Sequence, residues 1–211
     1  MDCGASSLIA MKRAGVEANE IGYVLLSHLH GDHFGGLPFL ILDGQFRRRE
    51  RDLTVAGPPG TRERVHQAME VLFPGSSSAT RRFHTSFVEM TTREPNEIGP
   101  ITARVFEMKH FSGAPSYAVR AAYGGKTIAY SGDTEWTPML AEAAADSDVF
   151  ICEAYFFEKR VPHHLDFLTL AEHRSELTCR RLVLTHMSED MLGRLHEIDA
   201  EAAADGTLLK L

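Results

Sequence analysis

Short apolar runs alternate along the chain with stretches of helical spacing, and glycine or proline separates many of them. The apolar runs predict strands at residues 21–26, 53–56, 101–108, 116–123, 127–131, 149–153, 182–185 and 208–211. Helical spacing predicts helices at residues 61–73, 138–145, 168–178 and 190–204, and loops are expected at 37–51 and 75–85. This alternation indicates an α/β (α+β) protein, with one domain that spans residues 1–211.

The composition fits a globular protein in a reducing compartment. With 211 residues and 44% hydrophobic content, the chain can bury a full core. No apolar stretch approaches the roughly 18 residues of a membrane span, and the N-terminus lacks the basic and apolar regions of a signal peptide. Cys3, Cys152 and Cys179 show no close pairing. A soluble, cytoplasmic protein without a disulfide framework is expected.

The net charge of -7 gives no general attraction to nucleic acid. A local exception is the basic run at residues 47–51, which has the sequence Arg-Arg-Arg-Glu-Arg. A solvated loop is the favoured interpretation of this run. The alternative is a patch that gathers an anionic substrate.

The most informative segment is residues 27–33, Ser-His-Leu-His-Gly-Asp-His, directly behind the predicted strand at 21–26. His28 and His30 are two residues apart and face the same way on an extended backbone. A turn at Gly31 then brings Asp32 and His33 to a second side of the same cavity. Imidazole and carboxylate groups are typical ligands of divalent transition metals, so this segment predicts a metal site, most naturally one for two ions.

Three further residues follow predicted strands in the same way, namely His110, Asp133 and His186. Ligands collect at strand ends because a sheet fixes their positions while the loops leave room for substrate. Each also has an ordinary alternative: Asp133 as a turn residue or helix cap, and the two histidines as buried imidazoles with satisfied hydrogen bonds.

These motifs, in this order, resemble the metallo-β-lactamase superfamily. Within it, the segments Tyr-Ser-Gly-Asp-Thr at 130–134 and Leu-Val-Leu-Thr-His-Met-Ser at 182–188 resemble the phosphodiesterase branch that contains ribonuclease Z. The resemblance implies a four-layer αβ/βα sandwich with a dinuclear metal site between two sheets. Because that fold usually opens with a β-hairpin before an Asp-x-Gly turn such as residues 2–4, the first β-hairpin is expected to be missing from this chain.

The resemblance also implies a ligand set. One ion would be held by His28, His30 and His110, the other by Asp32, His33 and His186, and Asp133 would bridge them. Zinc is the expected metal, with manganese or iron as alternatives. His164, 22 residues before His186, falls on a family position near the phosphate or leaving group.

Two departures from ribonuclease Z stand out. That family carries a long tRNA-gripping arm between the positions of His110 and Asp133, where this chain has 22 residues, enough for a hairpin. Ribonuclease Z also typically has a histidine at the position of Cys152, and its loss shifts a possible acid or phosphate contact to His164.

The function expected from these features is that of a metal-dependent hydrolase, a ribonuclease Z-like phosphodiesterase that uses a metal-bridging hydroxide. The partner would be RNA or an anionic nucleotide-like or cyclic phosphodiester. Asp32, which would orient the hydroxide or accept its proton, and His164 are the candidate catalytic residues. The alternatives are a carboxylic ester, thioester or lactone hydrolase at the same site and an inactive metal-binding subunit. The family suggests a homodimer, and the short apolar stretches predict no membrane partner.

Overall fold

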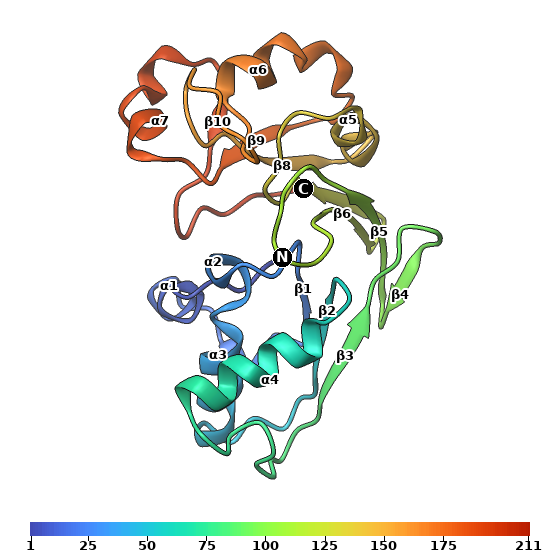
Figure 1. The fold of residues 1–211 in the computed structure, drawn as a ribbon, viewed down its shortest axis with the longest axis vertical. Coiled ribbons are helices and arrows are strands. Elements are labelled where there is room, and N and C mark those ends of the chain that lie inside the picture. The colour runs from blue at the N-terminus through green and yellow to red at the C-terminus, as the bar shows by residue number, and fades with distance from the viewer. The chain divides into compact units, whose positions relative to one another are not determined.

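A three-stranded parallel sheet and a seven-stranded mixed sheet organise the chain (Figure 1). The computed structural model describes residues 1–211 and divides into two compact units. The amino-terminal unit comprises residues 1–90 and 112–114, and the carboxy-terminal unit comprises residues 91–111 and 115–211. Each sheet lies within one unit, so each unit has its own core.

The sheet of the amino-terminal unit has the strand order β1-β2-β3. Its strands are β1 (Tyr23–Leu25), β2 (Leu53–Gly57) and β3 (Thr85–Glu89). The helices of this unit are α1 (Ser7–Arg13), η1 (Ala18–Glu20), α2 (Gly31–Phe34), α3 (Leu37–Phe46) and α4 (Thr61–Leu72). Buried side chains of β1, β2, α3 and α4 form the core, among them Val24, Leu40, Val55 and Val65.

The strand predicted at 21–26, the strand at 53–56 and the helix at 61–73 are all present with small changes of boundary. The loop expected at 37–51 is wrong, because α3 occupies its first ten residues. Apolar residues surround this helix rather than following one face, so the helical period is invisible in the sequence. Its proline, Pro38, lies in the first turn, where a helix tolerates it.

The basic run at 47–51 is a solvent-exposed loop, as the favoured interpretation predicts, except at Arg49. The guanidinium group of Arg49 is buried and donates hydrogen bonds to four backbone carbonyl groups, those of Ala18, Ile21, Arg51 and Asp52. Arg47 and Arg51 pair with Glu17 and Glu20, at 2.9 and 3.3 Å. Three of the four arginines therefore have structural partners.

The sheet of the carboxy-terminal unit has the order β10-β9-β8-β7-β6-β5-β4. Its strands are β4 (Asn96–Ile98), β5 (Ile101–Glu107), β6 (Tyr117–Tyr123), β7 (Lys126–Tyr130), β8 (Val149–Glu153), β9 (Leu182–Thr185) and β10 (Glu201–Ala202). The helices are α5 (Pro138–Ala144), α6 (Phe167–Glu172), η2 (Arg174–Glu176), α7 (Glu189–Gly193) and η3 (Leu195–Glu197).

Strands β7, β8 and β9 are neighbours and run parallel, with Tyr130 opposite Ile151 and Glu153 opposite Thr185. Their carboxyl ends therefore open onto one edge of the sheet. The strands predicted at 101–108, 116–123, 127–131, 149–153 and 182–185 and the helix at 138–145 are confirmed. A hairpin of β6 and β7 fills most of the interval between His110 and Asp133.

The carboxyl-terminal segment differs from the prediction. The helix expected at 190–204 is wrong, since α7 and η3 end before residue 198 and residues 201–202 pair with β9 as β10. Glu201 receives two hydrogen bonds from the Arg181 guanidinium group, 2.7 and 2.6 Å long, which tie β10 to the segment before β9. No strand forms at 208–211, where Leu208 is 90% exposed. The helix expected at 168–178 is shorter, because α6 ends at Glu172 and a 3₁₀ turn follows.

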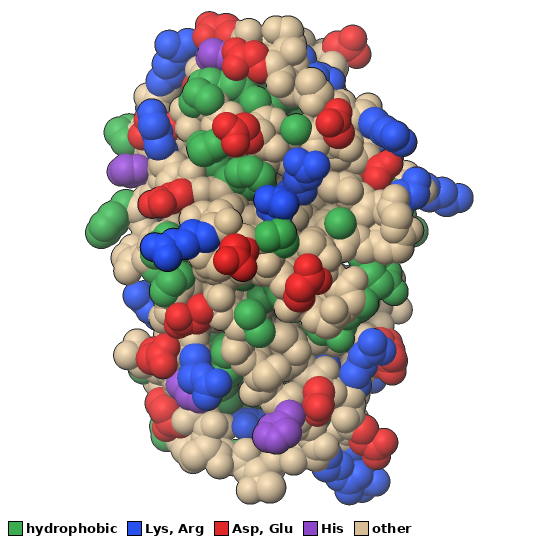
Figure 2. Space-filling view, turned by 90° about the vertical axis from the view of Figure 1, so that its right-hand side faces the viewer, with side chains coloured by type: hydrophobic (Ala, Val, Ile, Leu, Met, Phe, Trp, Pro, Cys, Tyr) green, Lys and Arg blue, Asp and Glu red, His purple; other side chains and the backbone are tan.

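None of the helices combines the length and apolar character that crossing a bilayer requires. On the face shown in Figure 2, basic and acidic side chains are intermixed. That face has no extended patch of one charge sign.

Candidate metal centre

The amino-terminal histidine array consists of His28, His30, Asp32 and His33. His28 and His30 lie just beyond β1, and the next turn of chain, α2, carries Asp32 and His33. The ring centroid of His28 is 4.9 Å from that of His30 and 4.0 Å from that of His33. His28 and His33 are buried, whereas the Asp32 side chain is 64% exposed. The structure therefore gathers the three imidazoles that the sequence predicts and leaves Asp32 at the surface beside them.

Asp2 supports this array, a role that the sequence reasoning missed. Its Oδ2 atom accepts a hydrogen bond from Nδ1 of His33 at 2.7 Å, and its Oδ1 atom accepts one from the backbone N–H of Ser27 at 2.7 Å. Burial alone raises the pKa of Asp2, but the hydrogen bonds from His33 and Ser27 and the attraction of His33 outweigh burial and hold it below its ordinary value. The bond to Nδ1 leaves Nε2 of His33 as the nitrogen that can bind a metal.

Ser27 orients the imidazole of His28 in a similar way. The Ser27 hydroxyl donates to Oδ2 of Asp2 at 2.8 Å, so its oxygen can accept from Nδ1–H of His28, 3.0 Å away. We assign His28 the tautomer with the proton on Nδ1, which again leaves Nε2 as the potential ligand atom. One carboxylate thus orients two imidazoles.

Two glycines allow the N-terminal turn to pack against α2. A Cβ atom on Gly4 would lie 2.0 Å from the carbonyl oxygen of Asp32, and one on Gly36 would lie 2.1 Å from the carbonyl oxygen of Gly4. Backbone hydrogen bonds from Cys3 N–H to His33 and from Gly36 N–H to Cys3 close the contact, at 2.7 and 2.8 Å. Because these are backbone contacts, a side chain at either glycine has no room.

The carboxy-terminal cluster consists of Asp133, Glu153, His164 and His186. Asp133 follows β7, Glu153 ends β8 and His186 follows β9, while His164 comes from the loop after β8. One potential ligand atom from each of the four lies within 4.8 Å of all the others. Nδ1 of His186 is 3.6 Å from Asp133 and 3.5 Å from Glu153, and both carboxylates are buried. The adjacent parallel strands explain this convergence.

Glu153 is the second functional residue that the sequence reasoning missed. Its Oε2 atom is 3.0 Å from Nδ1 of His164, and its other oxygen accepts a hydrogen bond from the backbone N–H of Thr134. The hydrogen bond that His164 donates to Glu153 raises the pKa of His164, and the charges of Glu153 and Asp133 add to this effect, while burial opposes it. A buried glutamate as the last residue of an apolar strand was the available sequence signal.

His110, also predicted as a ligand, lies beside this cluster in the same unit. Its Nε2 atom is 4.0 Å from Oδ2 of Asp133. Its Nδ1 donates to the backbone carbonyl of His163 at 2.8 Å, which orients Nε2 toward the carboxylate. The backbone N–H of His163 donates in turn to Glu135 at 3.1 Å, and His163 has a left-handed φ of 71°. The strained loop is therefore held at the position from which His164 reaches Glu153.

Cys152 does not contribute to the cluster. On β8 its side chain points away from that of Glu153 and is fully buried in the apolar core, where burial raises the pKa of its thiol.

Tyr155 contributes to the carboxy-terminal cluster, because its ring stacks on His164 with centroids 4.7 Å apart and lies 5.4 Å from His186. Phe34 and Leu37, which follow the histidine array in the sequence, are core residues, and Phe111, which follows His110, is exposed.

Both groups of residues fit a divalent metal ion. Imidazole and carboxylate are ligands that zinc and similar ions accept, and the four members of the carboxy-terminal cluster supply both kinds of group. Two buried carboxylates so close together require compensating positive charge, which the imidazoles supply in part. A divalent ion would supply the rest.

Comparison with known proteins agrees with this chemistry. The family described as beta-lactamase superfamily domain matches residues 1–187. Among curated proteins, ribonuclease Z of Lachnoclostridium phytofermentans is 25% identical in an alignment with a length of 243 positions. The alignment covers 90% of this chain and 78% of the relative.

Solved structures show the same fold. The metallo-beta-lactamase fold protein YhfI from Bacillus subtilis is 23% identical with a TM-score of 0.74, over 98% of this chain and 84% of that one. The short form of human tRNase Z is 21% identical with a TM-score of 0.74, over 97% of this chain and 84% of that one. The chain therefore has the metallo-β-lactamase fold and belongs to the β-lactamase superfamily of metal-dependent hydrolases, with ribonuclease Z among its relatives.

Proposed function

We propose that this protein is a metal-dependent phosphodiesterase. The observation that carries the proposal is the carboxy-terminal cluster, in which the ends of three adjacent strands bring two buried carboxylates and a histidine together with His164. The ribonuclease Z relatives support phosphodiester chemistry for such a centre.

The proposed ligand set comprises seven residues. One ion would be bound by His28, His30 and His110, and a second by Asp32, His33 and His186, with Asp133 shared between them. The assignment follows the order of the family motifs along the chain. It is supported within the amino-terminal unit by the hydrogen bonds that Asp2 and Ser27 accept from Nδ1 of His33 and His28, which make Nε2 the potential ligand atom of each ring.

Bound divalent ions would neutralise charge on a phosphoryl group and lower the pKa of water, so that a strong nucleophile exists near neutral pH. The exposed carboxylate of Asp32 would accept a proton from the attacking water. Glu153 holds His164 by its Nδ1 atom and favours the imidazolium form, so His164 would donate a proton to the leaving oxygen or hold a phosphoryl oxygen. Tyr155 fixes the plane of the His164 ring.

We propose RNA or a nucleotide-like or cyclic phosphodiester as the substrate class. The relatives named ribonuclease Z support RNA, but the interval from His110 to Asp133 holds only the β6–β7 hairpin. The intermixed charges in Figure 2 also offer no broad basic surface on that face. These features favour a substrate recognised close to the reacting phosphate over one gripped along its length.

The test is hydrolysis of bis(p-nitrophenyl) phosphate by purified protein with zinc or manganese added. We expect metal-dependent turnover that Asp133→Asn reduces by at least 100-fold, because a shared ligand is lost. Asp146→Asn is the matched control, since Asp146 is exposed and lies outside both groups of residues.

Loss of turnover in Asp146→Asn, or full activity in Asp133→Asn, would contradict the proposed centre. Hydrolysis of thioesters, lactones or carboxylic esters with no phosphodiester turnover would assign the centre to carbonyl substrates. Bound metal with no hydrolysis of either substrate class would identify a metal-binding subunit.

A further inference from the structure

A cavity of about 320 Å³ lies in the amino-terminal unit, between α4 and β3. This volume is at the lower end of the range of roughly 300 to 1,000 Å³ for small-molecule sites. The cavity includes Thr85, the first residue of β3, which is opposite Leu53, the first residue of β2. His28 follows the opposite, carboxyl end of β1 in the same parallel sheet. The cavity is therefore separate from the amino-terminal histidine array.

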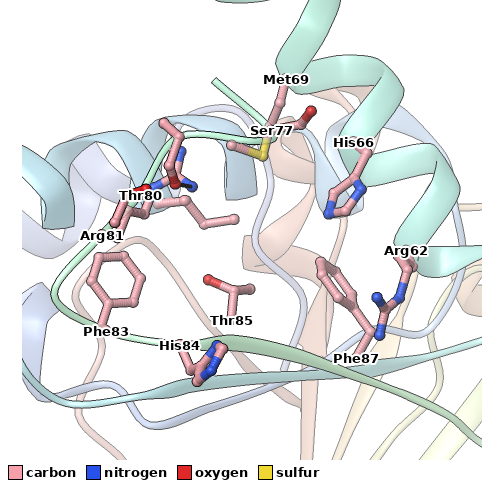
Figure 3. A pocket seen from close by; sticks show the side chains of 12 residues that line it. Arg62, His66, Met69, Ser77, Thr80, Arg81, Phe83, His84, Thr85 and Phe87 are labelled. Atoms are coloured by element: carbon pink, nitrogen blue, oxygen red, sulfur yellow. Dashed lines mark hydrogen bonds between the residues drawn. The ribbon is translucent and has the colours of Figure 1, made fainter. Parts of the chain in front are cut away.

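Side chains at regular intervals on α4 and on the segment that includes β3 form the walls of the cavity. Arg62, His66 and Met69 recur at intervals of four and three residues on one face of α4. Thr85 and Phe87 lie two residues apart on β3 and Phe83 lies two residues before the strand, and Figure 3 shows Thr85 between the two phenylalanine rings. The loop after α4 closes one end with Ser77, Ala79, Thr80 and Arg81.

The lining is basic. Of the 12 residues drawn around the cavity in Figure 3, two are arginines and two are histidines, Arg62, Arg81, His66 and His84. None is an aspartate or a glutamate. Burial lowers the pKa of Arg81, and no carboxylate offsets this effect. An anion in the cavity would supply the missing counter-charge.

Two buried polar atoms also favour a polar ligand. The terminal nitrogens of Arg81 donate to the carbonyl groups of Ala79 and Ser76, but its Nε atom is buried without a hydrogen-bond partner. The same is true of the Thr85 hydroxyl oxygen. Buried polar groups are nearly always hydrogen-bonded in folded proteins. An oxygen-rich anion could accept a hydrogen bond from both groups.

The aromatic residues favour a flat, apolar body on the same ligand. The guanidinium carbon of Arg62 lies 5.4 Å from the centroid of Phe87, and the His66 ring meets Phe87 edge to face with centroids 5.4 Å apart. Phe83 faces the cavity from the other side, backed by the guanidinium group of Arg49 at 5.2 Å. Aromatic and guanidinium groups arranged in this way stack readily on nucleobases.

We propose that this cavity binds a nucleoside monophosphate, either as a free nucleotide or as one unit of an RNA strand, with the phosphate near Arg81 and Thr85 and the base against Phe83 and Phe87. The inference does not depend on the hydrolase activity, because none of the residues involved belongs to the candidate metal centre. Arg62 lies beside Phe87, across the cavity from Arg81, and its positive charge would favour an anionic ligand that lies against Phe87.

The test is a titration of the full chain with AMP, followed by the ¹³C methyl signals of Ile41 and Met69. Both side chains line the cavity, so their chemical shifts report binding there even if AMP also binds at the metal centre. We expect saturable shifts. Arg62→Gln and Thr85→Val should raise the dissociation constant severalfold and Arg81→Gln about tenfold or more, the loss expected for a charge-assisted hydrogen bond.

The matched controls are Arg64→Gln and Arg82→Gln, which remove neighbouring exposed arginines that do not line the cavity. Both should bind AMP like the original protein. Because Arg81 also holds the loop after α4, Arg81→Gln could unfold it, and Thr85→Val then provides the decisive comparison. Unchanged affinity in both Thr85→Val and Arg62→Gln would overturn the proposal.

Further ligands separate the two parts of the site and the two sources of nucleotide. Equal affinity for adenosine would overturn the anion site, and equal affinity for inorganic phosphate would overturn the base site. A short single-stranded RNA that shifts the same methyl signals, with the same dependence on Arg62 and Thr85, supports a nucleotide within a strand. AMP binding without RNA binding supports the free nucleotide. Absence of saturable shifts with both ligands would overturn the proposal.

Discussion

The Nδ1 atom of His164 lies 3.0 Å from the Oε2 atom of Glu153, and this pair unites a loop residue with the buried end of a central strand. Through this contact the sheet determines the orientation of the imidazole. A proton donor that must reach a leaving oxygen benefits from such a fixed position.

The importance of His164 should depend on the leaving group. We expect His164→Ala to reduce turnover by about 100-fold or more for diesters with a basic alkoxide leaving group, and much less for p-nitrophenyl esters, whose leaving group needs little protonation. Glu153→Gln should show the same trend with a smaller loss, because its amide oxygen can still accept from Thr134. The measurement is a plot of log kcat against leaving-group pKa.

His196→Ala serves as the control for this series, since His196 is exposed and far along the chain from the cluster. Parallel plots for His164→Ala and the original protein would show that His164 does not protonate the leaving group.

Asp2→Asn should weaken metal binding without removing a ligand. The amide cannot hold His33 and Ser27 as the carboxylate does, so zinc affinity is expected to fall by about 10- to 100-fold. The metal-free protein should also lose roughly 1.5 to 3 kcal/mol of unfolding free energy, as for a hydrogen bond to a charged group. Competition with a chromophoric chelator and urea unfolding measure the two effects. Asp205→Asn, at an exposed position, should change neither quantity.

Gly36→Ala should be strongly destabilising. The new methyl group would meet the carbonyl oxygen of Gly4 at 2.1 Å, so the N-terminal turn must move away from α2. A loss of about 1 to 3 kcal/mol is expected in urea unfolding, as for other overpacked sites. Gly193→Ala is the contrasting variant, because no atom lies within 4 Å of its added Cβ. Equal stability of the two variants would refute the close contact.

The three thiols should be unreactive in the folded protein. Cys3, Cys152 and Cys179 are all buried, and burial raises the pKa of Cys3 to about 11. We expect negligible labelling by iodoacetamide near neutral pH, and modification of all three thiols after denaturation. Mass spectrometry of the labelled protein measures the number of modified thiols. Rapid labelling of any one thiol before unfolding would contradict the burial.

Glu70 should make stability depend on pH through the loop that closes the nucleotide cavity. Its carboxylate accepts hydrogen bonds from Ser77 and Gly75, which lower its pKa below the ordinary 4.5. A lowered pKa in the folded state means that the stabilisation is present above pH 4.5 and is lost as the pH falls through the folded value. Glu70→Gln should therefore lower Tm near neutral pH, and the difference should vanish in acid. A Tm difference that grows in acid would contradict this linkage, and Glu107→Gln is the exposed control.

The sequence predicts those parts of the centre whose signal is local. His28 and His30 are two residues apart behind an apolar strand, and Asp133 lies just behind another. The spacing of apolar residues and the local composition are therefore sufficient to predict these three side chains as ligands. Asp2 gives no such signal and Glu153 only that of a carboxylate at the end of an apolar run, because their roles arise from contacts with residues 31 and 11 positions away in the sequence. Only the folded chain brings these partners together.

The same distinction explains the errors in secondary structure. Apolar residues all round α3 hide its period, and the alanine-rich segment near residue 202 has helical propensity that pairing with β9 overrides. Tertiary contacts decide both segments. Strands such as β8, in contrast, are predicted with their correct boundaries because an apolar run between turn residues has few alternatives.

Arg49 changes how the most hydrophilic stretch of the chain must be treated in protein engineering. Its guanidinium group ties four carbonyl groups of separate turns together in the interior, so it behaves as a core residue although its neighbours are at the surface. Lysine could not replace it, because an ammonium group lacks the planar array of five donors. A redesign that removes charge for crystallisation or solubility can therefore replace the exposed Arg48, where a φ of 54° favours glycine or asparagine, but must leave Arg49 unchanged.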